Sequence, residues 1–100
     1  MIPIDTIQRF ISFQYGLQNA DMLSRRRASS VARPRQIAMY LARKLTGNSY
    51  PEIGRKFGGK DHTTVLHAFR HITNLRAQDK ELNDRLITFE LFLSKWQAAQ

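Results

Sequence analysis

The sequence predicts an all-α fold: a compact helical domain of about six helices, with a helix-turn-helix and a preceding basic loop. Three observations support this prediction. Apolar residues recur at helical spacing along most of the chain, no stretch shows the alternation of a half-buried strand, and 42 % apolar residues suffice for a small core. The 100 residues contain no internal repeat, low-complexity segment or dividing linker, so we expect a single domain over residues 1–100.

The chain opens with a predicted helix and a short turn. Apolar side chains near the N-terminus follow helical spacing: Ile4, Ile7 and Ile11. Pro3 stands near the start of this pattern and Gly16 near its end, as is typical of helix boundaries. The segment NADML, residues 19–23, is long enough for one helical turn.

A basic stretch and a long helix come next. Residues 24–33 are dense in Arg and Ser, which is typical of an exposed loop. Pro34 suits the first position of a helix, because the N–H that proline lacks would have no helical partner there. Behind it, apolar residues repeat every four positions: Ile37, Leu41 and Leu45. Gly47 is expected to end this helix.

Residues 49–72 carry the pattern of a helix-turn-helix. Ser49 and Glu52 have the spacing of a capping box at the start of a brief helix, and the glycine pair at 58–59 ends it. Asp61 is a favoured N-cap for the next helix. The inward stripe of that helix has i, i+3, i+4, i+7 spacing: Val65, Ala68, Phe69 and Ile72.

The C-terminal segment predicts one more amphipathic helix. Its apolar residues alternate between spacings of four and three: Leu82, Leu86, Phe89, Leu93 and Trp96. A face for a protein partner would show the same pattern, but such stripes usually pack on the core, and we expect core packing here.

Charge is the property that points to function. Sixteen Lys and Arg against eight Asp and Glu give a net charge of +8. The stretch SRRRASSVARPR, residues 24–35, holds five arginines and no acid. Acids collect instead toward the C-terminus: Asp79, Glu81, Asp84 and Glu90. One region is thus much more cationic than another, as expected of a surface that binds nucleic acid.

Composition and motifs give little support to an enzyme or a membrane protein. Cysteine is absent, which excludes disulfides and thiolate metal sites and is compatible with a reducing cytosol. The longest apolar runs, such as IAMYLA at 37–42, are too short to cross a bilayer. His67 and His71 have a spacing known from zinc sites, but no HExxH pattern or third ligand accompanies them. No phosphate-binding loop motif or catalytic triad stands out.

The start of the second helix of the motif is the sharpest functional signal. Asp61, His62, Thr63 and Thr64 are poor core residues, and in a helix-turn-helix this first turn lies against base edges in the major groove. His and Thr can donate or accept hydrogen bonds there, and a Thr methyl can touch a thymine methyl. The simpler roles are a helix cap for Asp61 and neutral surface positions for the threonines. Likewise, the arginines at 25–27 can reach into a narrow minor groove or form a solvated run of charge.

Two other functions stay open on these observations. The chain can be a binder of single-stranded nucleic acid or RNA, although the basic segment lacks the aromatic residues that stack on bases. It can also be a protein-interaction module whose cationic loop meets an acidic partner. Competition between duplex, single strands and an acidic protein would separate these possibilities.

Two stretches together resemble the C-terminal DNA-binding domain of the bacterial chromosomal replication initiator DnaA: SRRRASSVARPRQIAMYLARKLT and SYPEIGRKFGGKDHTTVLHAFRHI. The resemblance extends over essentially the whole chain and is strongest from Leu23 to Leu75. It implies an all-helical fold that binds double-stranded DNA at short asymmetric boxes in the replication origin.

The resemblance also implies roles for individual residues. Arg27 is similar in position to the family's minor-groove reader, and the major-groove base readers would be Asp61, His62 and Thr63. Contacts to the DNA backbone, or places bordering that surface, are implied for a larger set: Arg25, Arg35, Gln36, Arg43, Tyr50, Pro51, Lys60, Thr64 and His67. Lys60 stands where arginine is common, which would reduce a bidentate contact to a point charge. Tyr50 stands where leucine is common.

Full initiators of this family also carry an ATP-binding AAA+ domain and an N-terminal interaction domain, which these 100 residues do not include. We therefore expect no ATP hydrolysis and no cofactor in this chain, since ATP would bind only to the AAA+ domain of a full-length relative. The expected partner is double-stranded DNA, with no small-molecule substrate and no membrane insertion. We expect the isolated domain to be monomeric, cytoplasmic and nucleoid-associated.

Overall fold

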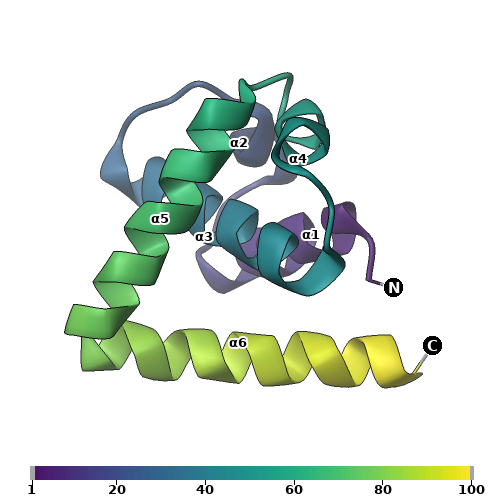
Figure 1. Ribbon diagram of the computed structural model, residues 1–100, viewed down its shortest axis with the longest axis vertical. Helices are drawn as coiled ribbons and strands as arrows, with labels where there is room; N and C mark the ends of the chain where they lie inside the picture. Colours follow the sequence, from purple (N-terminus) through teal and green to yellow (C-terminus); the bar gives the residue numbers. More distant parts are fainter. Residues whose placement is uncertain (1, 100) are drawn as a thin grey trace.

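Six helices make up the fold of residues 2–99, the part of the chain that the computed structural model describes, and that part contains no strand (Figure 1). In chain order the helices are α1 (Ile4–Gln14), α2 (Asn19–Leu23), α3 (Ser29–Thr46), α4 (Tyr50–Lys56), α5 (His62–Gln78) and α6 (Lys80–Ala99). The predicted all-α class is confirmed. No helix in the described residues is both long enough and apolar enough to cross a membrane.

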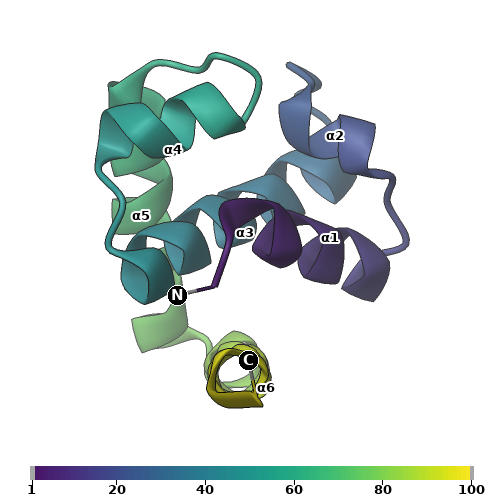
Figure 2. The same cartoon turned by 90° about the vertical axis from the view of Figure 1, so that its right-hand side faces the viewer.

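The long helix α3 occupies the middle of the molecule. It packs most extensively against α5 and α1, which lie on different sides of it (Figures 1 and 2). The predicted apolar stripes meet there in one core, whose buried members include Ile4, Ile7, Ile11, Ile37, Leu41, Val65, Ala68 and Ile72. Because a stripe decides which face of a helix is buried, it also decides which face remains exposed for binding.

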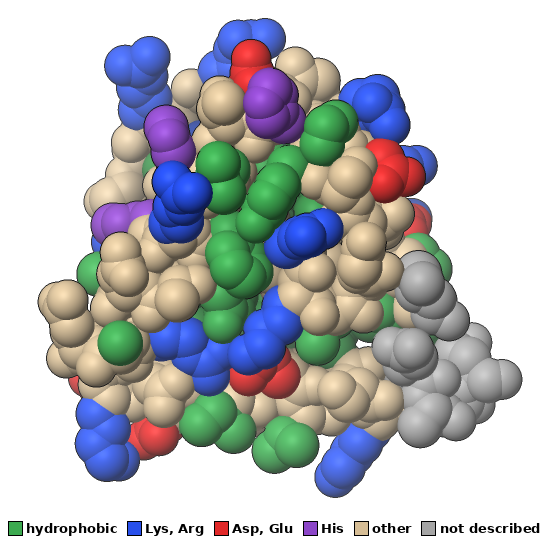
Figure 3. All heavy atoms as spheres, in the orientation of Figure 1, with side chains coloured by type: hydrophobic (Ala, Val, Ile, Leu, Met, Phe, Trp, Pro, Cys, Tyr) green, Lys and Arg blue, Asp and Glu red, His purple; other side chains and the backbone are tan. Residues whose placement is uncertain are grey.

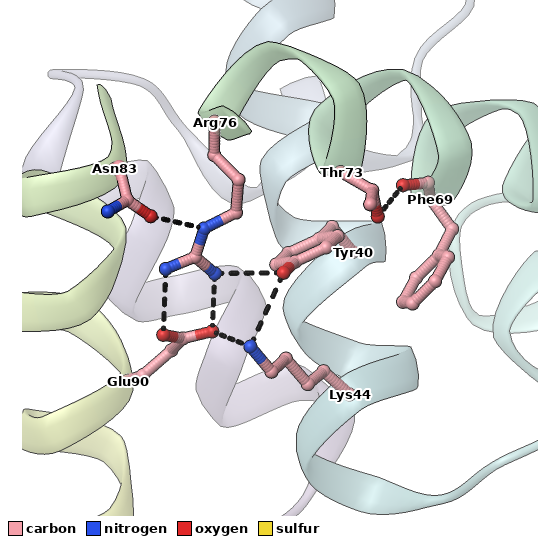
Figure 4. A network of polar contacts seen from close by, with 7 residues as sticks. All are labelled: Tyr40, Lys44, Phe69, Thr73, Arg76, Asn83 and Glu90. Carbon is pink, nitrogen blue, oxygen red and sulfur yellow. Dashed lines mark hydrogen bonds and ion pairs between the residues drawn. The ribbon is translucent and has the colours of Figure 1, made fainter. Parts of the chain in front are cut away.

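The C-terminal helix α6 runs along the lower edge of the molecule in Figure 1 and is seen end-on in Figure 2. Its buried residues confirm the predicted core packing: Leu86, Phe89 and Leu93. A polar junction then joins α6 to α3 and α5 (Figure 4). In it, Nη1 of Arg76 donates to Glu90 at 2.9 Å and to the hydroxyl of Tyr40 at 2.8 Å, and Nζ of Lys44 lies 2.8 Å from Glu90. The junction therefore attaches α6 to both α3 and α5.

The start of α3 corrects one prediction. The helix begins at Ser29 and not at Pro34, which lies in its second turn. The Ala28 carbonyl accepts the N–H of Val31 at 2.9 Å and so opens the helix early. Val31 is only 2 % exposed, and its burial favours this earlier start. In the second turn, Pro34 deprives a single carbonyl, that of Ser30, of its helical hydrogen bond.

The predicted basic loop over residues 24–33 is therefore wrong in its second half. The irregular segment comprises residues 24–28, SRRRA, and is called the arginine loop below. In Figure 1 it is the trace that arcs from α2 to α3 beside the N-terminal part of α5. Arg35 and Gln36, expected in the first turn of α3, lie in its second turn for the same reason.

Candidate nucleic-acid interface

The first helix of the helix-turn-helix, α4, is fixed at its start by the predicted capping box. The Ser49 hydroxyl accepts the N–H of Glu52 at 3.3 Å, and the Glu52 carboxylate accepts the N–H of Ser49 at 2.9 Å. Ile53 and Phe57 are fully buried and attach α4 to the core. The orientation of α4 is thus set at both ends of this short helix.

The turn after α4 lies tightly against α2. Gly58 has a φ of +84°, in the left-handed region where glycine is favoured. A Cβ atom at this position would collide with the backbone carbonyl of Leu23, the last residue of α2. The turn of the motif is therefore in direct contact with Leu23, the residue that immediately precedes the arginine loop.

The first turn of α5 presents its polar side chains to solvent. Oδ1 of Asp61 accepts hydrogen bonds from the backbone N–H and from the hydroxyl of Thr63, both at 2.9 Å, and lies 3.1 Å from Nδ1 of His62. These N–H and hydroxyl donors lower the pKa of Asp61, so the cap remains a carboxylate at neutral pH. Asp61, His62, Thr63 and Thr64 are all exposed. The predicted N-cap is confirmed, and the same residues are accessible to a ligand.

A hollow of about 440 Å³ lies between the arginine loop and the start of α5. Its lining comes from three segments and contains four cations: Arg25 and Arg27 from the loop, Arg35 from α3, and Lys60 from the turn before α5. Gly59, Asp61 and Thr64 complete the lining. Arg25 and Arg27 lie more than thirty positions before Gly59 in the sequence, and the fold brings them to one side of the molecule. Six of the residues implied by the resemblance as DNA contacts therefore line one hollow: Arg25, Arg27, Arg35, Lys60, Asp61 and Thr64.

A second hollow, of about 420 Å³, continues this surface between α3 and α5. It is lined by Arg35, Gln36, Met39, Lys60, Thr64, His67, Ala68 and His71. Figure 3 shows the three histidines of the chain along α5 with Lys and Arg side chains beside them. The resemblance implies a contact for His67 but not for His71, which lies four residues further along the same helix and lines the same hollow.

Lys60 stands where the two hollows meet. Its Nζ donates to the carbonyl of Phe57 at 2.6 Å. Burial, together with the positive charges of Arg35 and Arg25, lowers the pKa of Lys60 to about 8. An anion that entered either hollow would remove part of this unfavourable environment.

Arg35 is much less accessible than a phosphate contact at a helix start would be. It is 9 % exposed, and its guanidinium donates to the carbonyls of Asp21 and Arg26 and to the hydroxyl of Ser24. Burial lowers the pKa of Arg35, and the nearby Asp21 carboxylate partly offsets that effect. Most of the hydrogen-bonding capacity of Arg35 is thus directed at the chain itself.

Five of the implied contact residues line neither hollow. His62 and Thr63 lie beside Asp61 in the exposed first turn of α5, and the other three are Arg43, Tyr50 and Pro51. The Arg43 guanidinium stacks over the Tyr50 ring at 4.6 Å and donates to the carbonyl of Asn48 at 2.9 Å. Tyr50 is half-buried and Pro51 is exposed at the start of α4. These residues form a separate edge near the N-terminus of α4.

The histidines do not form a metal site within the described residues, where no group of three or more His, Cys, Asp or Glu is placed to hold an ion. Both hollows are also open to solvent, and both are lined in part by Arg35 and Lys60, whose positive charges repel a metal ion. Their chemistry suits an anion.

Comparison with known proteins gives a consistent result. Residues 4–72 match the family model described as the helix-turn-helix of the bacterial dnaA protein. Over 82 residues the chain is 58 % identical to the chromosomal replication initiator protein DnaA of Sphingopyxis alaskensis, which covers 82 % of this chain. Over 87 residues it is also 58 % identical to the protein of the same name from Caulobacter vibrioides, which covers 87 % of this chain.

The similarity extends to a solved structure but not to whole relatives. A crystal structure of a DNA replication initiation factor matches 87 % of this chain and 26 % of its own, with a TM-score of 0.79 and 34 % identity. The chain spans only 18 % of the length of both DnaA proteins. With its matched helix-turn-helix, its six-helix fold and this degree of identity, the chain belongs to the bacterial DnaA helix-turn-helix family.

Proposed function

We propose that this chain binds double-stranded DNA sequence-specifically, at short boxes in a bacterial origin of replication, and that it does so as a monomer without hydrolysing ATP. The observation that carries the proposal is the single cationic surface shared by the arginine loop and the first turn of α5. Family membership supports the same conclusion. Such a protein would act in the cytoplasm, at the nucleoid.

In this proposal the first turn of α5 reads bases in the major groove. Thr63 donates its hydroxyl proton to Asp61, so its oxygen is left as an acceptor and its methyl group can meet a thymine methyl. Only Oδ1 of Asp61 takes part in the contacts of the cap, which leaves Oδ2 to accept from a cytosine amino group. His62 supplies a ring N–H or acceptor beside them.

The arginine loop would reach the adjacent minor groove. We assign base reading there to Arg27, as the resemblance implies, and contact with the phosphates to Arg25; both line the hollow that faces α5. A narrow minor groove has an enhanced negative potential, which favours guanidinium groups. Two contacts in neighbouring grooves would fix the register of the protein on a short box.

Affinity would come mostly from phosphates. The second hollow is lined by Lys60, Thr64 and His67 together with Arg35 and Gln36. The N–H groups at the start of α5 add a positive dipole end. Arg43, Tyr50 and Pro51 would follow the DNA backbone at the α4 edge.

Selection from random duplexes at two salt concentrations tests the proposal. We expect one enriched asymmetric box, and an affinity that falls with log salt at a slope of about −5 if roughly six phosphates are neutralised. Competition with the same sequence as single-stranded DNA and as RNA should displace the duplex weakly. Equal binding to scrambled duplexes, or preference for single strands or for an acidic protein, would contradict the proposal.

A further inference from the structure

The three consecutive arginines of the loop are not equivalent. Arg26 forms an ion pair with Asp21, at 3.6 Å between Nη1 and Oδ1, and its carbonyl accepts from Arg35 at 2.7 Å. Arg25 and Arg27 instead line the hollow that faces α5. Arg26 is thus engaged with α2 and α3, whereas its two neighbours line the side of the loop that faces α5.

The loop is held from two directions. On the α3 side, Nη1 of Arg35 lies 3.4 Å from both the Asp21 carbonyl and the Ser24 hydroxyl, and Nη2 holds the Arg26 carbonyl. On the other side, Leu23 lies against Gly58 of the helix-turn-helix. A buried guanidinium with its donors used in this way resists replacement, because any lost bond leaves polar groups unpaired in a partly dry site.

From these contacts we infer that Arg35 is a positioning residue: it fixes the arginine loop against the helix-turn-helix so that Arg25 and Arg27 are presented to DNA together with the first turn of α5. The inference rests on the proposed function. It separates Arg35 from residues that contribute charge alone. A lysine at this position would keep the charge, but its ammonium cannot reproduce the forked geometry that reaches Ser24 and Arg26 at once.

The first test needs no DNA. Trypsin cleaves after arginine, so the rate of cleavage after residues 25, 26 and 27 reports how firmly the loop is held. We expect Arg35→Lys to raise that rate by about tenfold or more while circular dichroism shows an intact helical fold. The matched control is Arg33→Lys, the same change at an exposed position of the same helix, which should leave the cleavage rate unchanged.

The second test is a double-mutant cycle on the selected duplex. With Arg35 present, Arg27→Ala should lower affinity about ten- to hundredfold, as expected for loss of a base contact. In the Arg35→Lys background the same change should cost less than about threefold, because a loose loop no longer presents Arg27. Should Arg35→Lys fail to fold, Ser24→Ala keeps the guanidinium and should shift both measurements in the same direction by smaller factors.

The outcomes are distinguishable. Equal cleavage in Arg35→Lys and wild type, or an Arg27→Ala effect that is the same in both backgrounds, would overturn the positioning role and leave the proposed DNA binding standing. If Arg35→Lys speeds loop cleavage but the wild-type protein shows no sequence-specific DNA binding, the proposed function is overturned. The role of Arg35 in holding the arginine loop would then remain supported.

Discussion

Lys60 provides the sharpest test of where the phosphates lie. In the free protein its pKa is about 8, because burial and the charges of Arg35 and Arg25 disfavour the ammonium. A DNA phosphate in either hollow would favour the charged form and raise that pKa toward the ordinary value of 10.5. Binding would then take up a proton between these two values, so affinity should be highest below pH 8 and should fall as pH rises.

The size of the effect follows from the two pKa values. A full return from about 8 to 10.5 lowers the affinity about tenfold between pH 7 and pH 9. Lys60 is only half-buried, and solvent screening reduces the shift, so we expect a fall of about three- to tenfold. Lys60→Arg should remove this part of the pH dependence, because arginine stays charged throughout the range.

The assay is fluorescence anisotropy of a labelled duplex at constant ionic strength, with wild type and Lys60→Arg measured side by side. The pH dependence of folding stability is an independent check, because stability should rise with pH where affinity falls. The unfolded chain binds the Lys60 proton more tightly, so the stability of wild type relative to the variant should rise as pH increases above 8. If both proteins lose affinity in parallel between pH 7 and 9, Lys60 does not face a phosphate in the complex.

Three further predictions concern the recognition turn, the motif and the helical junction. Thr63→Ala should weaken binding to the selected box by about 1–3 kcal/mol and flatten base preference at one position in a repeated selection, whereas equal losses on scrambled duplexes would exclude base reading. Gly58→Ala should lower thermal stability by about 1–3 kcal/mol more than Gly59→Ala, since both have positive φ but only the first would collide with the α2 backbone. Equal losses of stability in the two variants would show that the turn does not pack closely against α2. Glu90→Gln should lower the free energy of unfolding by about 1–3 kcal/mol at pH 7 without changing DNA affinity. Burial raises the pKa of Glu90, but hydrogen bonds from Arg76 and Lys44 outweigh burial and leave it below the ordinary 4.5. The difference in stability between wild type and Glu90→Gln should therefore fade below about pH 4.5, and a difference that stays constant at low pH would show that it does not come from the carboxylate charge.

Apolar spacing predicted the helices because a buried stripe is a local property of the sequence. The residues of the α1 and α5 stripes pack where their spacing puts them, and the capping residues Ser49 and Asp61 form the predicted hydrogen bonds. Each of these features depends on neighbours within one or two turns. Local reasoning therefore sufficed for them.

The predictions that were wrong concern features that tertiary contacts determine. Taken alone, Pro34 fits the first position of a helix. In the structure α3 begins five residues earlier, at Ser29, and the burial of Val31 favours this start. The role of Arg35 could not be predicted either, since its partners are two carbonyls and a hydroxyl far from it in the chain. No residue type marks a carbonyl as an acceptor for a particular arginine. Tertiary packing alone makes that assignment.

Helix α3 takes part both in the proposed DNA recognition and in the stability of the fold, which the experiments above measure separately. Its N-terminal half carries Arg35 and borders the cationic hollows, whereas Tyr40 and Lys44 further along hold Arg76 and Glu90 at the junction with α6 (Figure 4). The matched helix-turn-helix segment ends at residue 72, before the end of α5 and before α6. A change at the junction should therefore alter stability alone, and a change at the loop should alter recognition alone. Loss of box preference in Glu90→Gln would mean that α3 transmits strain between its ends, and the two functions would then have to be treated as coupled.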